Sequence, residues 1–164
     1  MNKPERTPLS FVYEAFLARI TADDWTVEEE LAIVERDWQQ LLNMAIFRFK
    51  YPRVSLEYSP LGDADNTCLR GLAFNEALTN DEIQILAALM KHEWIRRCIA
   101  SWENIKQLYT DKDFSQANHL DKLLKLESTV AEEIDHLVGI YDRSRNKAPA
   151  DYFRRLAGKK NAIK

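Results

Sequence analysis

The sequence predicts a mainly α-helical protein, a helical bundle built on a long antiparallel pair of helices, with a small β-hairpin insertion and an extended C-terminal arm. Three observations predict this fold class. Only 4 glycines and 5 prolines occur among 164 residues, which favours long regular elements over turns. Apolar residues recur at helical spacing across residues 78–143, interrupted by a short polar turn at 110–113 that predicts two antiparallel helices. A strand-like alternation of apolar and polar residues occurs near residues 54–58.

The long helical pair has a well-defined start. Thr79 and Glu82 have the spacing of a capping box, and Leu78 with Ile83 has that of a hydrophobic staple. The first helix of the pair then carries apolar residues on two faces, which is typical of a helix buried between neighbours.

Two shorter helices are predicted ahead of this pair. The first begins with Ser10 as its N-cap and ends near Thr21. The second has a capping box at Thr26 and Glu29. It ends before Pro52, because the residue preceding a proline is disfavoured in a helix.

A β-hairpin insertion is predicted at about residues 53–74. Val54, Leu56 and Tyr58 alternate with polar residues, as in a half-buried strand, and residues 68–74 can form the return strand. An isolated hairpin is marginally stable in water. We therefore expect the hairpin to pack on the helices or to pair with another chain.

The charge is unevenly distributed along the chain. Residues 143–164 contain eight Lys or Arg and one acidic residue, a net charge of +7, so with −3 overall residues 1–142 carry −10. Residues 144–149, which end in a proline, predict a linker. We therefore expect a helical domain over residues 1–143 and a basic arm over residues 144–164.

The basic arm also contains aromatic and apolar residues, which indicates a segment that becomes ordered when it meets a partner. A disordered, solubilising tail is the alternative. The arm residues that we expect to bind a partner are Arg145, Lys147, Tyr152, Phe153, Arg154, Arg155, Leu156, Lys159 and Lys160.

The sequence contains no pattern that predicts catalysis, a metal or a cofactor. Glu133 and His136 have the Glu-x-x-His spacing of metal sites in helical bundles, but such sites need two of these motifs and two further glutamates. The three histidines, among them His92 and His119, form no nucleophile–base pair with a cysteine, and phosphate-binding and zinc motifs are absent. We therefore expect a protein that is not an enzyme.

The four tryptophans are interpreted as internal packing: Trp25, Trp38, Trp94 and Trp102.

The chain is expected to be made in a reducing cytoplasm and to have no membrane association. No apolar run approaches the roughly 18 residues of a membrane-spanning helix, and the first residues lack the apolar segment of a signal peptide. Cys68 and Cys98 are interpreted as thiols of a protein made in a reducing compartment, since no disulfide framework is visible.

Several short segments resemble small structural proteins of tailed bacteriophages. They are residues 15–21 (AFLARIT), 47–53 (FRFKYPR), 78–83 (LTNDEI, followed by Glu93-Trp94) and 114–120 (FSQANHL). The order of the expected elements is similar to that of the head–tail connector, or adaptor, proteins of the phage neck. The resemblance covers roughly residues 11–142.

This resemblance implies a structural virion protein without catalytic residues, assembled in the host cytoplasm. Copies would form a homo-oligomeric ring, commonly a dodecamer, beneath the portal protein, and the two-faced helix would contact both its own core and a neighbouring subunit. The C-terminal arm would dock on the portal, and the next neck or tail protein would attach to the ring.

The ring implied by the resemblance would also prolong the channel through which packaged DNA passes. An acidic lumen offers phosphates no counter-charge. Candidate lumen residues are Glu28, Glu29, Glu30 and Glu132, with helix capping or solvation as the simpler account. The alternative function is a non-catalytic regulatory or adaptor helical domain that binds a protein partner or nucleic acid.

Overall fold

The computed structural model describes residues 6–20, 31–61, 71–108 and 114–160, with side chains over 6–20, 34–61, 71–101 and 120–144. Within these residues the protein is mainly helical and has a small two-stranded antiparallel sheet, as the sequence predicts. The elements are α1 (Leu9–Leu17), α2 (Leu31–Arg48), β1 (Tyr58–Pro60), β2 (Leu72–Phe74), α3 (Asn80–Leu108) and α4 (Phe114–Lys160).

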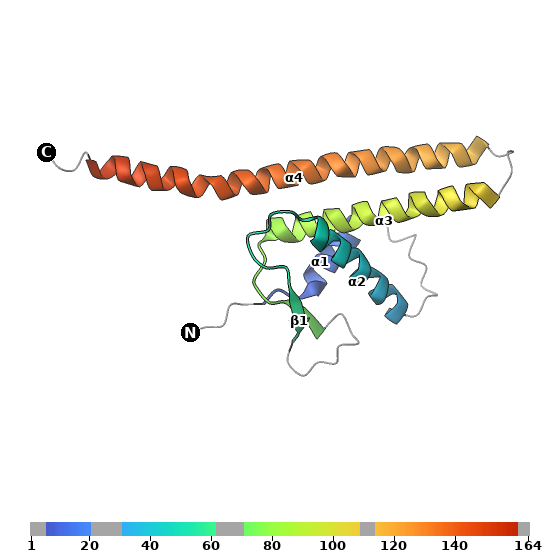
Figure 1. Cartoon of the computed structure of the whole chain (residues 1–164), viewed down its shortest axis with the longest axis horizontal. Coiled ribbons are helices and arrows are strands. Elements are labelled where there is room, and N and C mark those ends of the chain that lie inside the picture. Colours follow the sequence, from blue (N-terminus) through green and yellow to red (C-terminus); the bar gives the residue numbers. More distant parts are fainter. Residues whose placement is uncertain (1–5, 21–30, 62–70, 109–113, 161–164) are drawn as a thin grey trace.

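Helix α3 lies in the middle of the molecule. Helix α4 runs beside it in the opposite direction, while α1 and α2 pack on its other side (Figure 1). The main core is formed where α1, α2 and the sheet meet α3, and a smaller cluster of Ile95, Ile99 and Val130 joins α3 to α4. The turn expected at residues 110–113 lies outside the described residues.

The two-faced character of α3 is confirmed, but its consequence is different from the one expected. Six consecutive residues, from Ile85 to Met90, are buried, because α1 and α2 cover one side of the helix and α4 covers the other. Over this stretch both faces of α3 are therefore occupied within the chain. The second apolar face, which was expected to contact a neighbouring subunit, is covered by α4 over this stretch.

The capping box at the start of α3 is confirmed. Glu82 accepts a hydrogen bond from the backbone N–H of Thr79 at 2.8 Å, and the Glu82 N–H donates to the Thr79 hydroxyl at 3.3 Å. These bonds satisfy amides that a helix start leaves without intrahelical partners. Leu78 and Ile83, the expected staple, are both half-buried against the main core.

Helix α1 begins and ends earlier than the sequence predicts. It begins at Leu9 after Pro8, whose backbone is extended, so Ser10 lies inside the helix and is not its N-cap. The helix ends at Leu17, not near Thr21. The reason for the early start is that Pro8 pairs with Ala73 next to β2, which fixes the chain as extended immediately before Leu9.

The N-terminal segment is also fastened to the sheet by Arg6. Its guanidinium group donates to the backbone oxygens of Ser59, Pro60, Ala73 and Phe74 at 2.8–3.2 Å. One charged group thereby satisfies carbonyls from both strands, and charge-assisted bonds of this kind are stronger than neutral ones.

The sheet is smaller than the predicted hairpin. The expected strand over residues 54–58 is wrong for residues 54–57, since β1 begins at Tyr58, and the return strand shortens to β2. Leu56 is buried in the core, so the alternating pattern reflects packing on the helices without strand pairing. β1 pairs with β2 within the chain, Tyr58 opposite Phe74. Cys68 and the rest of residues 62–70 lie outside the described residues.

Helix α2 ends at Arg48, ahead of Pro52 as predicted, while its expected capping box at Thr26 and Glu29 lies outside the described residues. The linker predicted at residues 144–149 is wrong, since α4 continues as a helix through Pro149 to Lys160. A proline inside a helix removes one hydrogen bond and bends the helix without necessarily ending it. The expected domain boundary at residue 143 therefore falls within α4.

Candidate functional site

Phe47 of α2 and Tyr51 are the most exposed large apolar side chains among the described residues. Phe47 is 89% exposed, Tyr51 just beyond the helix is 68% exposed, and Met44 is 50% exposed. Met44 and Phe47 are three residues apart and lie on one side of the helix, and Tyr51 follows the end of the helix. We call Met44, Phe47 and Tyr51 the α2 outer face. Contiguous exposed apolar residues mark interaction surfaces more often than single ones do.

The α2 outer face lies in a positively charged part of the chain. Residues 38–56 contain Arg48, Lys50 and Arg53 and no Asp or Glu, although the body of the protein is acidic. Lys50 is exposed, and the Arg48 side chain is 37% exposed. Arg48 is also engaged with Glu93, and Arg53 with Ser144.

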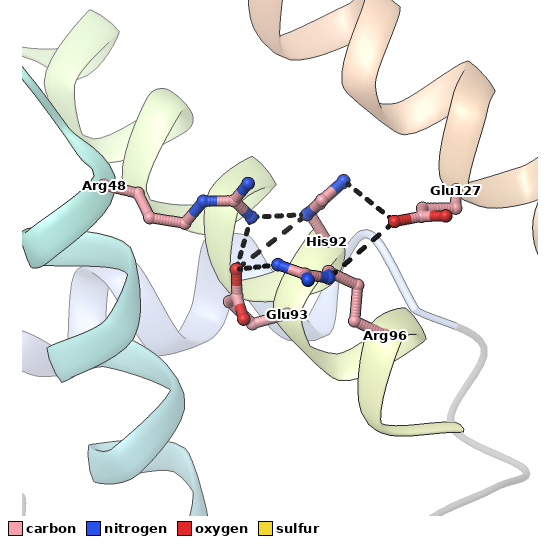
Figure 2. A network of polar contacts seen from close by, with 5 residues as sticks. All are labelled: Arg48, His92, Glu93, Arg96 and Glu127. Atoms are coloured by element: carbon pink, nitrogen blue, oxygen red, sulfur yellow. Dashed lines mark hydrogen bonds and ion pairs between the residues drawn. The ribbon is translucent and has the colours of Figure 1, made fainter. Parts of the chain in front are cut away.

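A cluster of five charged or titratable side chains joins α2, α3 and α4 (Figure 2). Glu93 of α3 lies at its centre and forms an ion pair and hydrogen bond with Arg48 of α2. Arg48 Nη1 also lies 2.7 Å from His92 Nδ1. On the other side, Glu127 of α4 lies 3.7 Å from His92 Nε2 and 3.8 Å from Arg96 Nε.

His92 is neutral in this arrangement. A guanidinium group only donates hydrogen bonds, so His92 Nδ1 accepts from Arg48 and the ring hydrogen lies on Nε2, toward Glu127. Burial and then the positive charge of Arg48 lower the pKa of His92, and the carboxylates of Glu127 and Glu93 offset this only in part.

The cluster is a structural junction between the three helices. Glu93 and His92 are buried, and each has a charged partner. Breaking such a buried pair leaves an uncompensated charge, so the cluster holds the three helices in one arrangement. Within the described residues no group of three His, Cys, Asp or Glu side chains could hold a metal ion.

A second buried junction joins the start of α3 to α4. The carboxylate of Glu82, fully buried, accepts hydrogen bonds from the Tyr141 hydroxyl at 2.7 Å and from the Arg53 backbone N–H at 3.1 Å. The Arg53 N–H also donates to the Tyr141 hydroxyl at 2.7 Å, and the Arg53 guanidinium lies 4.8 Å from the centre of the Tyr141 ring. The capping glutamate thus also fixes α4.

The ionisation of the second junction follows from these contacts. Burial alone would raise the pKa of Glu82, but the hydrogen bonds from Thr79, Tyr141 and Arg53 outweigh it and lower the pKa. Burial, together with the hydrogen bond to the negative Glu82, raises the pKa of Tyr141 to about 12. The pair is therefore a carboxylate and a neutral phenol at neutral pH.

The two residues of the single Glu-x-x-His motif, Glu133 and His136, have different surroundings. Glu133 pairs with Arg19 of α1, which also donates to Gln84 at 2.8 Å, whereas His136 is exposed. Trp38 and Trp94 are half-buried against the main core, and the side chains of Trp25, Trp102 and His119 lie outside the described ones.

The residues predicted to bind a partner in the basic arm all lie in α4. The helix passes the N-terminal end of α3 and extends beyond the rest of the body (Figure 1). The residues that sequence reasoning missed are those of the α2 outer face. The helical periodicity of α2 could have indicated them, because it places them opposite the buried residues Leu41, Leu42, Ala45 and Phe49.

Comparison with protein-family models, curated proteins and solved structures gives no match for this chain. No helix in the described part of the chain is long and apolar enough to cross a membrane.

Proposed function

We propose that the protein is a non-enzymatic structural subunit of a tailed phage, a head–tail connector whose copies form a ring under the portal. In this proposal the ring prolongs the DNA channel and provides the attachment site for the tail. The bundle with its antiparallel αα hairpin would form the wall of the ring, and the basic end of α4 would be the portal-binding arm.

The observation that carries the proposal is the length and charge of α4. Its 47 residues correspond to about 70 Å at 1.5 Å per residue, against about 44 Å for α3, which has 29 residues. The last described contacts with the body include the hydrogen bond from Arg53 to Ser144 at 2.7 Å. Beyond Ser144 the helix carries six Lys or Arg before it ends at Lys160, so a basic helical segment follows the last described contact with the body.

The resemblance to connector proteins supplies the rest of the proposal. A helical segment that projects from each subunit of a ring suits attachment to a neighbouring ring, since one subunit contact is repeated by symmetry. The sequence segments that resemble connector proteins include residues 47–53, which contain Phe47 and Tyr51 of the α2 outer face.

The test removes residues 146–164 and measures attachment of the protein to portal-bearing phage heads. Truncation after Arg145 leaves the bond between Arg53 and Ser144 in place, so the body should keep its thermal unfolding midpoint. We expect attachment to be lost. Replacing Arg154, Arg155, Lys159 and Lys160 by Gln is the matched control for charge alone, and it should weaken attachment more at low salt than at high salt. Attachment that is unchanged by the truncation would show that the arm does not bind the portal.

A regulatory domain that binds nucleic acid is the competing function, and the basic end of α4 is the observation that favours it. Binding of this kind would show a steep loss of DNA affinity with rising salt. Tight, salt-sensitive DNA binding that disappears on truncation after Arg145, without any attachment to portal-bearing heads, would replace the connector proposal.

A further inference from the structure

The cluster of charged side chains between α2, α3 and α4 contains a group whose charge can change near neutral pH. That group is His92, because an imidazole ordinarily titrates between pH 5 and 8. Its side chain is only 8% exposed. Charged groups face it from all three helices (Figure 2): Arg48 of α2, Glu93 and Arg96 of α3, and Glu127 of α4.

The charges of the cluster cancel while His92 is neutral. Two arginines and two glutamates then face one another, and their charges sum to zero. A proton on His92 adds a positive charge at a buried site, where a charge without a partner is costly. The cluster is balanced again when one of its other cations leaves.

Arg48 is the cation that a proton on His92 displaces. The Arg48 guanidinium donates to His92 Nδ1 across 2.7 Å, but a protonated imidazole carries hydrogens on both ring nitrogens and has no acceptor. Two donors would then face each other at this contact. Arg96 lies instead against the carboxylates of Glu93 and Glu127, at 3.9 and 3.8 Å. The Arg48 side chain is 37% exposed, so it can turn outward into solvent.

Protonated His92 can replace Arg48 as the partner of Glu93. His92 Nδ1 lies 3.9 Å from Glu93 Oε1, and His92 Nε2 lies 3.7 Å from Glu127 Oε1. Each N–H of the imidazolium therefore has a carboxylate close by. Glu93, which is buried, keeps a positive partner throughout the exchange.

We propose that this cluster is an acid-sensitive fastening of α2: protonation of His92 expels Arg48 from the cluster, His92 takes its place beside Glu93, and the end of α2 is released from α3. The freed guanidinium group then lies in solvent beside Phe47 of the α2 outer face. The inference does not depend on the proposed function, because every group in it belongs to one chain.

The release is confined to one end of α2. A second ion pair between α2 and α3, Asp37 with Arg97, contains no histidine and does not respond to this proton. It lies about 16 Å from Arg48 along the helix, at 1.5 Å per residue. The buried Leu41 and Leu42 lie between the two pairs. Acid therefore loosens the last turn of α2 while the earlier turns stay packed on α3.

The first test follows the ring nitrogens of His92 by NMR in the wild-type chain as the pH is lowered from 7.5 to 5.0. At pH 7.5 we expect the hydrogen on Nε2 and an accepting Nδ1. At lower pH both nitrogens should become protonated, and the side-chain N–H groups of Arg48 should lose their protection from solvent in the same pH range. A ring that stays neutral until the protein unfolds, or that gains its proton while Arg48 stays protected, overturns the inference.

The second test measures amide hydrogen exchange along α2, corrected for the intrinsic effect of pH on exchange. Protection at residues 46–49 should fall by about tenfold or more between pH 7.5 and the pH at which His92 is charged, because this turn opens locally. Protection at residues 36–41 should stay the same. An equal loss in both segments would show general destabilisation and would overturn the local release.

The third test uses matched arginine substitutions. In Arg48→Met no guanidinium remains to be expelled, so the acid-dependent loss of protection at residues 46–49 should disappear. The pKa of His92 should rise, because the positive charge of Arg48 lowers it. Arg97→Met is the control, since it removes the ion pair without a histidine between the same two helices, and it should leave the acid-dependent loss in place.

The inference fails if Arg48→Met retains the acid-dependent loss or if Arg97→Met abolishes it. The first two tests use the wild-type chain, so they decide the matter even if a substituted protein does not fold.

Discussion

At the scale of single residues, a few buried polar side chains each join two or three elements that also meet in the hydrophobic core. Glu82 receives donors from the start of α3, from Arg53 and from α4, and Glu93 holds α2 to α3. A buried polar group contributes to stability only when it is satisfied. The two buried tyrosines Tyr141 and Tyr13 provide a direct comparison.

Tyr141→Phe should lower the free energy of unfolding by about 1–3 kcal/mol, because it deprives Glu82 of a donor in a buried site. The matched change Tyr13→Phe should cost nothing, since the buried Tyr13 hydroxyl has no hydrogen-bond partner within the described residues. Urea unfolding of both variants measures the difference. Similar losses for the two substitutions would contradict the account of the junction.

His92 should make stability depend on pH. Its pKa in the folded protein lies below the ordinary 6.5, so between these two values the unfolded chain binds a proton that the folded protein does not. This proton uptake by the unfolded chain does not affect stability above about pH 6.5. The free energy of unfolding should decrease as the pH falls from 6.5 toward the lower pKa of His92 in the folded protein. The groups that face His92 are Arg48, Glu93, Arg96 and Glu127.

The measurement is the urea midpoint between pH 7.5 and 5.5 for the wild type and for His92→Gln. The glutamine variant should lose part of the pH dependence, even if it is less stable throughout. His136→Gln is the control substitution, because His136 is an exposed histidine of α4 that lies outside the cluster. An identical slope in the wild type and His92→Gln would contradict a depressed pKa.

At the scale of elements, local signals predicted the helices better than they predicted the strands. The capping box of Thr79 and Glu82 is a local pattern, and it gave the start of α3 to within a residue. The alternation at Val54, Leu56 and Tyr58 was also local, but whether an extended segment pairs or packs depends on distant partners. Here the Arg53 N–H donates to Glu82 and Tyr141, so the segment is anchored to helices.

The error at residues 144–149 has a similar origin. A proline in a helical pattern often marks the end of the helix. Here the residues on both sides of Pro149 are helical, and α4 continues across it. The sequence does not show whether the helical turns after Pro149 compensate for the one backbone hydrogen bond that the proline removes.

Pro149→Ala should strengthen the far end of α4. The alanine restores an N–H donor inside the helix and removes a ring clash, a local gain of about 3 kcal/mol. Hydrogen exchange of the amides at residues 150–160 should slow, while Ala150→Gly should speed it. Unchanged exchange in Pro149→Ala would contradict a helix that continues across this position.

At the scale of the whole molecule, the sequence predicted the helical class and the uneven charge but not the surfaces. The charge asymmetry between residues 1–142 and 143–164 is a count, so it needs no structure. Which apolar residues remain outside the core depends on how α2 packs on α3, and only the fold shows that Phe47 is left exposed while Phe49 is buried. The covered second face of α3 was likewise visible only once α4 was placed.

The connector proposal depends on features at all three scales. It needs rigid subunits, complementary faces and the basic end of α4 that extends from the body. The most direct measurement is the mass and rotational symmetry of the full-length protein bound to portal-bearing phage heads, from particle images averaged without imposed symmetry. The account predicts a closed ring of identical copies at the portal, with α4 ends directed toward it. Single copies scattered over the head, or no bound protein, would contradict it.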